Sequence, residues 1–220
     1  MQFSKRLQRL FLFCCVGMCT LSVHAQTNIY QLQPGDILFQ DLDCGAACDA
    51  IEKVTVGANG MDFSHCGIVV VMDGEYKVVE AYGNVRATPV ADFVSRIKDV
   101  NGKPKILAGR PDNKSLAAAS ADIAQQFIGK GYDDAFDLTN DSYYCSELVY
   151  ECYRKGNGNK PYFMLNLMTF KEPGTDEIMP FWKEYYKKLN KSVPEGEPGI
   201  NPGAMSRNKN LTLFTLPDVN

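Results

Sequence analysis

A cysteine at the predicted start of a helix is the first feature of this sequence that could perform chemistry. Cys145 precedes an amphipathic segment, residues 146–155, whose apolar side chains recur at helical spacing. The N-terminus of a helix carries partial positive charge and unpaired N–H groups, which favour a thiolate and can hold an oxyanion. Cys145 and Cys152 are seven residues apart and share the inward face of this helix. Cys145 is therefore a candidate nucleophile, with a buried structural cysteine as the alternative.

His65 and Glu80 are predicted to lie side by side on a β-hairpin. Asp73-Gly74 is the strongest two-residue turn signal in the chain, and it separates two apolar segments. With these residues at the centre of the turn, His65 lies opposite Tyr82, and Glu80 is its diagonal neighbour on the same face. A carboxylate side chain reaches an imidazole at that distance, so the hairpin predicts a base beside an orienting acid. The alternatives are an ordinary strand histidine and a glutamate that faces solvent.

The pattern around these residues predicts strands with a few helices. Mainly antiparallel strands with interspersed helices indicate an α+β fold in one domain. The aromatic-rich residues 162–186 either cap a cleft or pack on the outside of the sheet. Strands are expected at residues 37–39, 63–72, 76–82, 105–108 and 211–216. Helices are expected at residues 44–56, 90–99, 113–127 (with Asn113 as N-cap) and 146–155.

Four short motifs resemble segments of the NlpC-type cell-wall cysteine peptidases. Most members of that family have the cysteine helix before the histidine strand, whereas here the histidine and glutamate come first. The chain is therefore similar to the circularly permuted, YiiX/YebB-like branch of the papain-like fold, over residues 33–206. The four motifs are Phe63-Ser64-His65-Cys66-Gly67-Ile68-Val69, Val78-Val79-Glu80-Ala81, Gly129-Lys130-Gly131-Tyr132 and Tyr144-Cys145-Ser146-Glu147-Leu148-Val149. Two further segments fit this branch, Pro34-Gly35-Asp36-Ile37-Leu38-Phe39 and Asn201-Pro202-Gly203-Ala204.

The resemblance implies a circularly permuted papain-like (NlpC-type) fold, with a central antiparallel sheet or partial barrel packed with helices. It implies that Cys145 is the nucleophile, that His65 is the base and that Glu80 orients His65. Tyr132 matches the tyrosine whose hydroxyl assists the oxyanion site, with a hydrogen-bonded core tyrosine as the alternative. Glu147 stands where non-permuted members usually have glycine, so their substrate preference does not transfer to this chain.

Residues 1–25 are typical of a secretory signal peptide. A basic start is followed by an apolar run over residues 10–23, which is too short to span a membrane comfortably, and Ala25 precedes the expected cleavage point. A lipid-modified Cys19 and an uncleaved anchor are less favoured alternatives. The expected organisation is a signal peptide at 1–25 and one hydrolase domain at 26–220, with 192–220 as an extended C-terminal segment. We therefore expect a periplasmic or extracellular protein without a stable membrane span after signal cleavage.

Removal of this leader changes three counts. Eight cysteines become five, two histidines become one, and the net charge goes from −3 to −6. His65 is then the histidine that any imidazole chemistry must use. No basic excess remains to neutralise phosphates, so nucleic acid is not an expected partner. Cys44 and Cys48 either form a disulfide or stay as two reduced thiols, Cys66 and Cys152 are interpreted as packing residues, and no metal or cofactor is expected.

These observations predict an exported cysteine hydrolase that cleaves amide bonds. Its expected substrate is a peptidoglycan stem peptide or a related peptide, attacked through thioester chemistry. One alternative is a thioesterase or acyltransferase of the same fold with an acyl-lipid substrate. Another is a non-catalytic cell-wall binding module, which the presence of both cysteine and histidine disfavours. The substrate, the oligomeric state and the question of whether residues 192–220 cover the site are left open.

Overall fold

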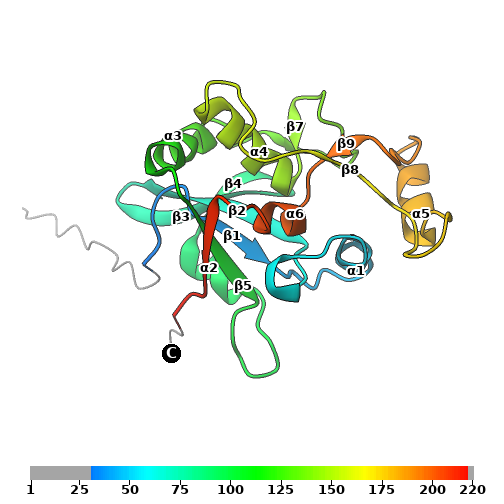
Figure 1. Cartoon of the computed structure of the whole chain (residues 1–220), viewed down its shortest axis with the longest axis horizontal. Coiled ribbons are helices and arrows are strands. Elements are labelled where there is room, and N and C mark those ends of the chain that lie inside the picture. The colour runs from blue at the N-terminus through cyan, green and yellow to red at the C-terminus, as the bar shows by residue number, and fades with distance from the viewer. Residues whose placement is uncertain (1–30, 218–220) are drawn as a thin grey trace, which may run out of the picture.

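An eight-stranded sheet forms the centre of the molecule (Figure 1). The computed structural model describes residues 31–217, so the predicted signal peptide at 1–25 and Cys19 lie outside the described residues. The sheet order is β10-β5-β1-β2-β3-β4-β6-β7, and every neighbouring pair is antiparallel except β6 with β7. Its strands are β1 (Ile37–Gln40), β2 (His65–Met72), β3 (Glu75–Tyr82), β4 (Asn84–Pro89), β5 (Ile106–Pro111), β6 (Gly131–Tyr132), β7 (Ser142–Tyr143) and β10 (Leu211–Phe214).

Helices cover both faces of this sheet (Figure 1). Helices α3 and α4 pack on one face, α2 packs on the other, and α1 and α5 lie together at one end. A small second sheet pairs β8 (Asn166–Leu167) with β9 (Pro198–Gly199). The helices are α1 (Ala46–Glu52), the short 3-10 helix η1 (Ala58–Gly60), α2 (Val90–Ser95), α3 (Lys114–Gln125), α4 (Cys145–Gly156), α5 (Pro180–Lys188) and α6 (Pro202–Ser206).

The central hairpin of β2 and β3 has the predicted register. Met72 pairs with Glu75 and Gly67 with Glu80, so Asp73-Gly74 occupies the turn. Gly74 has a φ of 79° and Asp73 a φ of 54°, which is the left-handed backbone that a tight hairpin turn requires. Because β2 lies between two layers of helices, its residues 65–70 are buried on both faces. This hairpin carries His65 and Glu80 into the interior of the protein.

Helices α3 and α4, which pack against each other, begin with side-chain caps. The Asn113 side chain accepts a hydrogen bond from the Leu116 backbone N–H at 3.0 Å, which confirms the predicted N-cap of α3. At the start of α4, the Tyr144 backbone N–H donates to Glu147 Oε2 at 3.2 Å, and Glu147 thereby closes a capping box. Helix α4 therefore begins at Cys145, with its first turn held in place.

The α+β fold with an antiparallel sheet packed by helices is confirmed, and the structure adds elements that the sequence pattern did not indicate. Strand β4 occupies residues that were predicted neither as strand nor as helix, and β6 and β7 are too short to show a period. The C-terminal segment is part of the fold, because β10 pairs with β5 at the edge of the sheet. Within residues 31–217, no helix is both long enough and apolar enough to cross a bilayer.

Of the two alternatives for Cys44 and Cys48, the structure has the disulfide. The bond joins the loop before α1 to the first turn of that helix. The other cysteines among the described residues, Cys66, Cys145 and Cys152, are free and buried.

Gly67→Ala tests the close approach of the strands at the centre of the hairpin. A Cβ at Gly67 would lie 2.4 Å from Val78 Cγ1 and 3.2 Å from Glu80 Cβ, so the strands must move. We expect the variant to lose about 1–3 kcal/mol of unfolding free energy in urea denaturation. We also expect the imidazole signal of His65 to shift in NMR spectra of a chain lacking residues 1–25, because Glu80 is displaced.

Gly109→Ala is the matched control on β5, which β1 separates from the hairpin in the same sheet. A Cβ there would lie 3.0 Å from Phe39 Cε2, in a packed region away from the hairpin turn. This variant should lose stability without moving the His65 signal. Full stability in Gly67→Ala, or an equal shift of the His65 signal in both variants, would contradict the expectation.

Candidate active site

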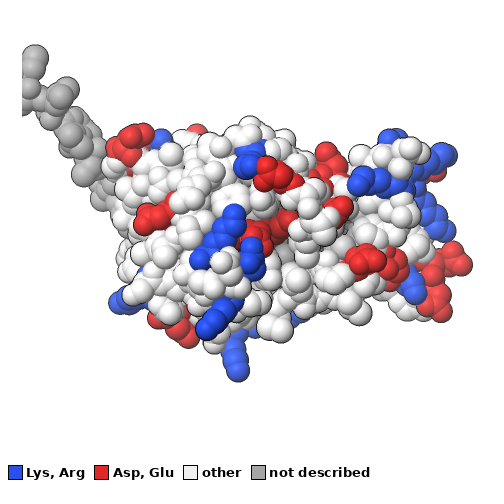
Figure 2. Space-filling view, turned by 90° about the horizontal axis from the view of Figure 1, so that it is seen from above, with Lys and Arg blue, Asp and Glu red and all other residues white. Residues whose placement is uncertain are grey.

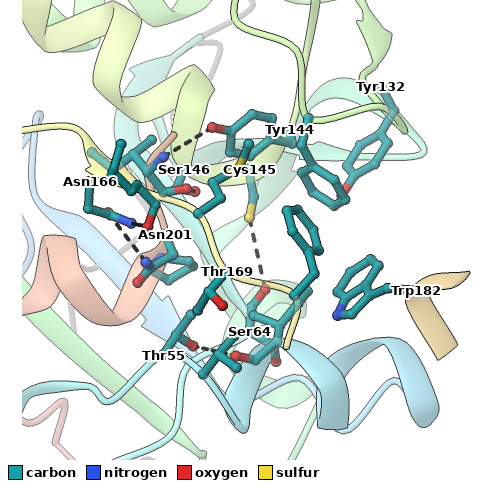
Figure 3. A pocket seen from close by; sticks show the side chains of 18 residues that line it. Thr55, Ser64, Tyr132, Tyr144, Cys145, Ser146, Asn166, Thr169, Trp182 and Asn201 are labelled. Atoms are coloured by element: carbon teal, nitrogen blue, oxygen red, sulfur yellow. Dashed lines mark hydrogen bonds between the residues drawn. The ribbon is translucent and has the colours of Figure 1, made fainter. Parts of the chain in front are cut away.

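Cys145 lies at the N-terminus of α4, as its sequence position predicts. The residue is 7% exposed, and its Sγ lies 3.9 Å from the backbone oxygen of Ser64, which precedes β2 (Figure 3). The first backbone N–H groups of an α-helix have no partner within the helix. The thiol therefore combines a positive helix end with free donors, an environment that stabilises a thiolate and an oxyanion.

The hairpin brings His65 and Glu80 into direct contact. His65 Nε2 lies 2.6 Å from Glu80 Oε2, and both side chains are buried. Gly67 lies directly opposite Glu80 and, without a side chain, leaves room for the Glu80 side chain to reach His65. The contact between these two residues, predicted from the hairpin register, is confirmed.

The Glu80 carboxylate is held from several directions. Arg96, just after α2, donates from Nη2 to Glu80 Oε1 at 2.6 Å and from Nη1 to Oε2 at 3.0 Å. Thr88 Oγ1, on β4, donates to Glu80 Oε1 at 2.6 Å, and Arg86 Nε lies 3.6 Å from the same oxygen. Burial by itself raises the pKa of Glu80, but its hydrogen bonds with His65, Arg96 and Thr88 lower it well below its usual range. The carboxylate is therefore ionised.

The His65 ring is packed as well as hydrogen-bonded. Phe93 stacks on it with ring centroids 5.8 Å apart, and Tyr82 meets it edge-on at 5.9 Å. Burial alone lowers the pKa of His65, but side-chain hydrogen bonds with Cys145 and Glu80 outweigh burial and raise the pKa to about 9. Because Glu80 holds Nε2, the other ring nitrogen is left for the thiol. Cys145 lies close to this part of the chain, because its Sγ is 3.9 Å from the backbone oxygen of Ser64, the residue before His65.

Cys66 is a neighbour of Cys145 that the sequence interpretation did not anticipate. As predicted, alternation along β2 turns Cys66 away from His65, and it packs in the same core cluster as Cys145. The pKa of Cys145 lies well below its usual range, first because of a side-chain hydrogen bond with Cys66 and then because of His65, although burial acts the other way. Burial raises the pKa of Cys66 well above its usual range. The lowered pKa of Cys145 and the raised pKa of His65 both favour a thiolate beside an imidazolium.

Glu147 caps the helix and stands apart from the pocket described below. The residue is 2% exposed, and burial raises the pKa of its carboxyl to about 8, although the hydrogen bond from Tyr144 opposes this. Glu147 is therefore mostly protonated at neutral pH. A neutral group two residues from Cys145 does not repel the thiolate, which explains how an acidic residue is tolerated where the non-permuted family has glycine.

Tyr132 lies on β6 and shares a pocket with Cys145, and Figure 3 shows its hydroxyl end turned toward that pocket. Burial raises the pKa of Tyr132 well above its usual range, and the nearby charge of Cys145 raises it further. The hydroxyl is therefore protonated at neutral pH and available as a hydrogen-bond donor. Its part in an oxyanion site stays a prediction.

A pocket opens beside Cys145 (Figure 3). None of its 18 lining side chains is Asp, Glu, Lys, Arg or His. Its walls come from α1, from the segment 166–170, from Trp182 on α5, and from residues 200–202. The C-terminal segment is attached to the start of α4, because Ser146 Oγ donates to the Ile200 oxygen at 2.9 Å and the Ile200 N–H donates to the Tyr144 hydroxyl at 3.2 Å. Residues 200–202 therefore form a wall of the site.

Sequence reasoning missed the residues that surround Glu80. Thr88 and Arg86 belong to β4, and the alternation of polar and apolar residues after the turn at Gly83 is the signal that would have revealed this strand. Arg96 had no such signal, because a lone arginine after a short helix is ordinary. Trp182 was included in the aromatic segment, and the structure places it in the pocket wall.

Charged residues of both signs are interspersed on the face seen in Figure 2, and the end that carries α5 bears acidic and basic groups together. The lining of the pocket beside Cys145, which contains no Asp, Glu, Lys, Arg or His, differs in composition from this mixed surface.

A cysteine at a helix N-terminus, facing a strand histidine that a buried carboxylate orients, is the site of the papain-like class. Here the strand precedes the helix in the chain, so the order is permuted. A model of the permuted papain-like amidase family, YaeF/YiiX or C92, matches residues 31–215, and the chain belongs to this family. The family is one of amidases, which are hydrolases that act on amide bonds.

Two Escherichia coli proteins illustrate the similarity. The chain is 28% identical over 196 residues to the uncharacterized protein YiiX of strain K12, which covers 88% of this chain and 91% of that protein. It also superposes with a TM-score of 0.70 on the crystal structure of yiiX from E. coli O157:H7, at 26% identity and covering 86% of this chain and 99% of that chain. That crystallised yiiX is described as a metalloprotein.

The described residues of this chain do not form a cluster suited to binding a metal ion. Between residues 31 and 217, no group of three or more His, Cys, Asp or Glu side chains is arranged so that it could hold a metal ion. We therefore derive no step through a metal below.

The thiolate assignment predicts a distinctive reactivity toward iodoacetamide. Because the pKa of Cys145 lies well below its usual range, its labelling rate should stay nearly constant between pH 9 and pH 6. Burial raises the pKa of both Cys66 and Cys152, so neither should label in the folded protein. Mass spectrometry of digested samples would measure the three rates, with urea-unfolded protein as the control in which all three thiols react. A Cys145 rate that falls about tenfold per pH unit below pH 8 would contradict the assignment, because an ordinary thiol has a pKa of about 8.5.

Proposed function

We propose that this protein is a cysteine hydrolase that cleaves amide bonds through a thioester on Cys145. The observation that carries the proposal is the buried His65–Glu80 pair next to Cys145, whose Sγ lies 3.9 Å from the backbone oxygen of Ser64, the residue before His65, with the pocket opening beside the thiol. Membership of an amidase family supports the same reaction class.

In the first half of the reaction, the Cys145 thiolate attacks the carbonyl carbon of the substrate. A carbon–sulfur bond forms, and the carbonyl electron pair moves onto oxygen, where the Cys145 backbone N–H and the Tyr132 hydroxyl donate hydrogen bonds. The electron pair then returns and the carbon–nitrogen bond breaks. The leaving nitrogen takes its proton from the His65 imidazolium, which leaves a thioester and a neutral histidine.

In the second half, water replaces the amine. Neutral His65 removes a proton from the water as its oxygen attacks the thioester carbon. Collapse of this second intermediate breaks the carbon–sulfur bond, releases a carboxylic acid and restores the thiolate beside the imidazolium. Glu80, kept ionised by Arg96 and Thr88, stabilises the imidazolium and holds the ring in place.

The substrate we propose is a peptide, with peptidoglycan stem peptides or related peptides as its source. The pocket supports this proposal because it combines apolar walls with neutral hydrogen-bonding side chains, among them Thr55, Asn166 and Asn201. Such a lining suits uncharged peptide groups better than a carboxylate or an ammonium group. The apolar walls also favour a second candidate, an acyl-lipid ester or thioester cleaved by the same Cys145 chemistry.

Substitution of the catalytic residues tests the reaction. Defined muropeptides, peptide anilides and acyl esters would be incubated with the protein, and the products read by mass spectrometry. On whichever substrate is cleaved, we expect Cys145→Ala and His65→Ala each to reduce the rate on the order of 10³-fold or more. Glu80→Gln should reduce it less, because His65 keeps a hydrogen-bond partner but loses the negative charge beside it.

Cys152→Ala provides the matched control. Cys152 is buried on the same helix, seven residues from Cys145, and takes no part in the proposed reaction. Its variant should keep the native rate, and circular dichroism should show that every variant is folded. Full activity in a folded Cys145→Ala variant would overturn the proposal.

We further propose that the protein is exported and cleaved after Ala25. The Cys44–Cys48 disulfide supports this, because such bonds persist mainly in oxidising compartments. Expression of the whole chain in a Gram-negative host should yield a periplasmic protein with the mass of residues 26–220, whereas a chain lacking residues 2–25 should stay in the cytoplasm. An uncleaved cytoplasmic chain would contradict export, and a lipid-linked chain beginning at Cys19 would contradict the cleavage site.

A further inference from the structure

Trp182 has a buried hydrogen-bond donor without a partner. The residue is 3% exposed, and its Nε1 has no acceptor among the described residues. Phe136 and Phe170 pack edge-to-face against the indole ring, at 5.9 and 5.1 Å between ring centroids, so the ring is held in one orientation. A buried indole N–H usually finds a partner, and one left unpaired is costly.

The missing acceptor belongs in the pocket beside Cys145. Trp182 is one of the residues that line this pocket, and Figure 3 shows its nitrogen on the ring edge that faces Ser64 and Thr169. Neither Ser64 nor Thr169 accepts a hydrogen bond from Nε1. Nε1 itself is covered in this structure, so an occupant of the pocket supplies the acceptor when the side chains around the indole edge shift slightly on binding.

The reaction geometry indicates which half of the substrate lies there. This step rests on the proposed function, in which His65 gives its proton to the leaving nitrogen. His65 is not among the residues that line the pocket, whereas Cys145 is. The leaving amine must lie on the His65 side of the thiol, so the acyl half of the substrate occupies the pocket.

We propose that Trp182 is a specificity-determining residue, and that the pocket takes an uncharged apolar residue whose N-acyl carbonyl oxygen accepts a hydrogen bond from Trp182 Nε1. The apolar walls, which include Ile51 and Val54, disfavour a charged residue because the lining has no Asp, Glu, Lys, Arg or His and the Cys145 thiolate is the attacking group. A plain hydrocarbon chain would pack against the apolar walls of the pocket but would give Trp182 Nε1 no hydrogen-bond acceptor. The substrate is thus an N-acylated apolar amino acid or a peptide that ends in one.

Three anilides separate these features. N-acetyl-leucine p-nitroanilide has both the apolar side chain and the acceptor. 4-Methylpentanoyl p-nitroanilide keeps the hydrocarbon but lacks the acetamido group, and N-acetyl-glutamate p-nitroanilide keeps the acetamido group but carries a charge. We expect the native protein to have its highest kcat/KM on the leucine compound.

Trp182→Phe keeps an aromatic ring and removes the N–H. We expect it to lower kcat/KM on the leucine compound at least tenfold, mainly through KM. Its kcat/KM on the 4-methylpentanoyl compound should stay within twofold of the native value. Tyr185→Phe is the control, because Tyr185 lies on the same helix, donates to Asp134 and does not line the pocket. This control variant should keep the native kcat/KM on both compounds. An equal loss on both substrates in Trp182→Phe, or a native preference for the 4-methylpentanoyl or glutamate compound, would overturn the proposal.

A binding measurement distinguishes this proposal from the reaction that it rests on. Titration of N-acetyl-leucine amide into Cys145→Ala and into Cys145→Ala/Trp182→Phe requires no turnover. We expect the second variant to bind at least tenfold more weakly, whether or not Cys145 is the nucleophile. Equal affinity in the two variants would overturn the role of Trp182, whereas full activity in Cys145→Ala would overturn only the proposed function.

Discussion

The ionised carboxylate of Glu80 is the group on which the geometry of the site depends. Its side chain is fully buried, and a buried charge is tolerated only where hydrogen bonds and opposite charges compensate it. His65 on β2, Thr88 on β4 and Arg96 after α2 supply that compensation. Three elements that are separate in the chain are therefore held together at one point, and removal of a partner leaves the buried charge less well compensated. The same contacts keep His65 in the orientation that reaches Cys145.

From this carboxylate, charge alternates along the site. Glu80 is negative, the pKa of His65 is raised to about 9, and the pKa of Cys145 is lowered, which favours a positive imidazole between two negative groups. The N-terminus of α4 and the Cys66 thiol add to the stabilisation of the thiolate from the other face of the sheet. Glu147, whose pKa is raised to about 8, stays mostly neutral and does not disturb this order. The reactivity of Cys145 thus comes from its neighbours on both faces of β2, and its own burial works against it.

Permutation of the chain leaves this arrangement intact because the interactions depend on contacts in space. Residues 200–202 come from the far end of the chain. The hydrogen bonds of Ile200 with Ser146 and Tyr144 attach them to the start of α4. The pocket wall that results is uncharged, and it meets α5 through the aromatic cluster around Trp182. Cys145, His65 and Glu80 lie on the sheet and on α4, whereas much of the pocket wall comes from connecting segments together with α1 and α5.

The sequence by itself determined the central part of the site. A two-residue turn sets the hairpin register, so His65 and Glu80 had to be neighbours, and a helix that begins at Cys145 follows from local periodicity. Strand β4, Arg96, Cys66 and Trp182 were decided only by the tertiary structure. Each of these contacts a neighbour that is distant in the chain or on another strand. The periodicity of a short sequence segment carries no information about such a pairing. The pocket shows the same limit, because its walls from α1, α5 and residues 200–202 meet only when the sheet and helices have packed.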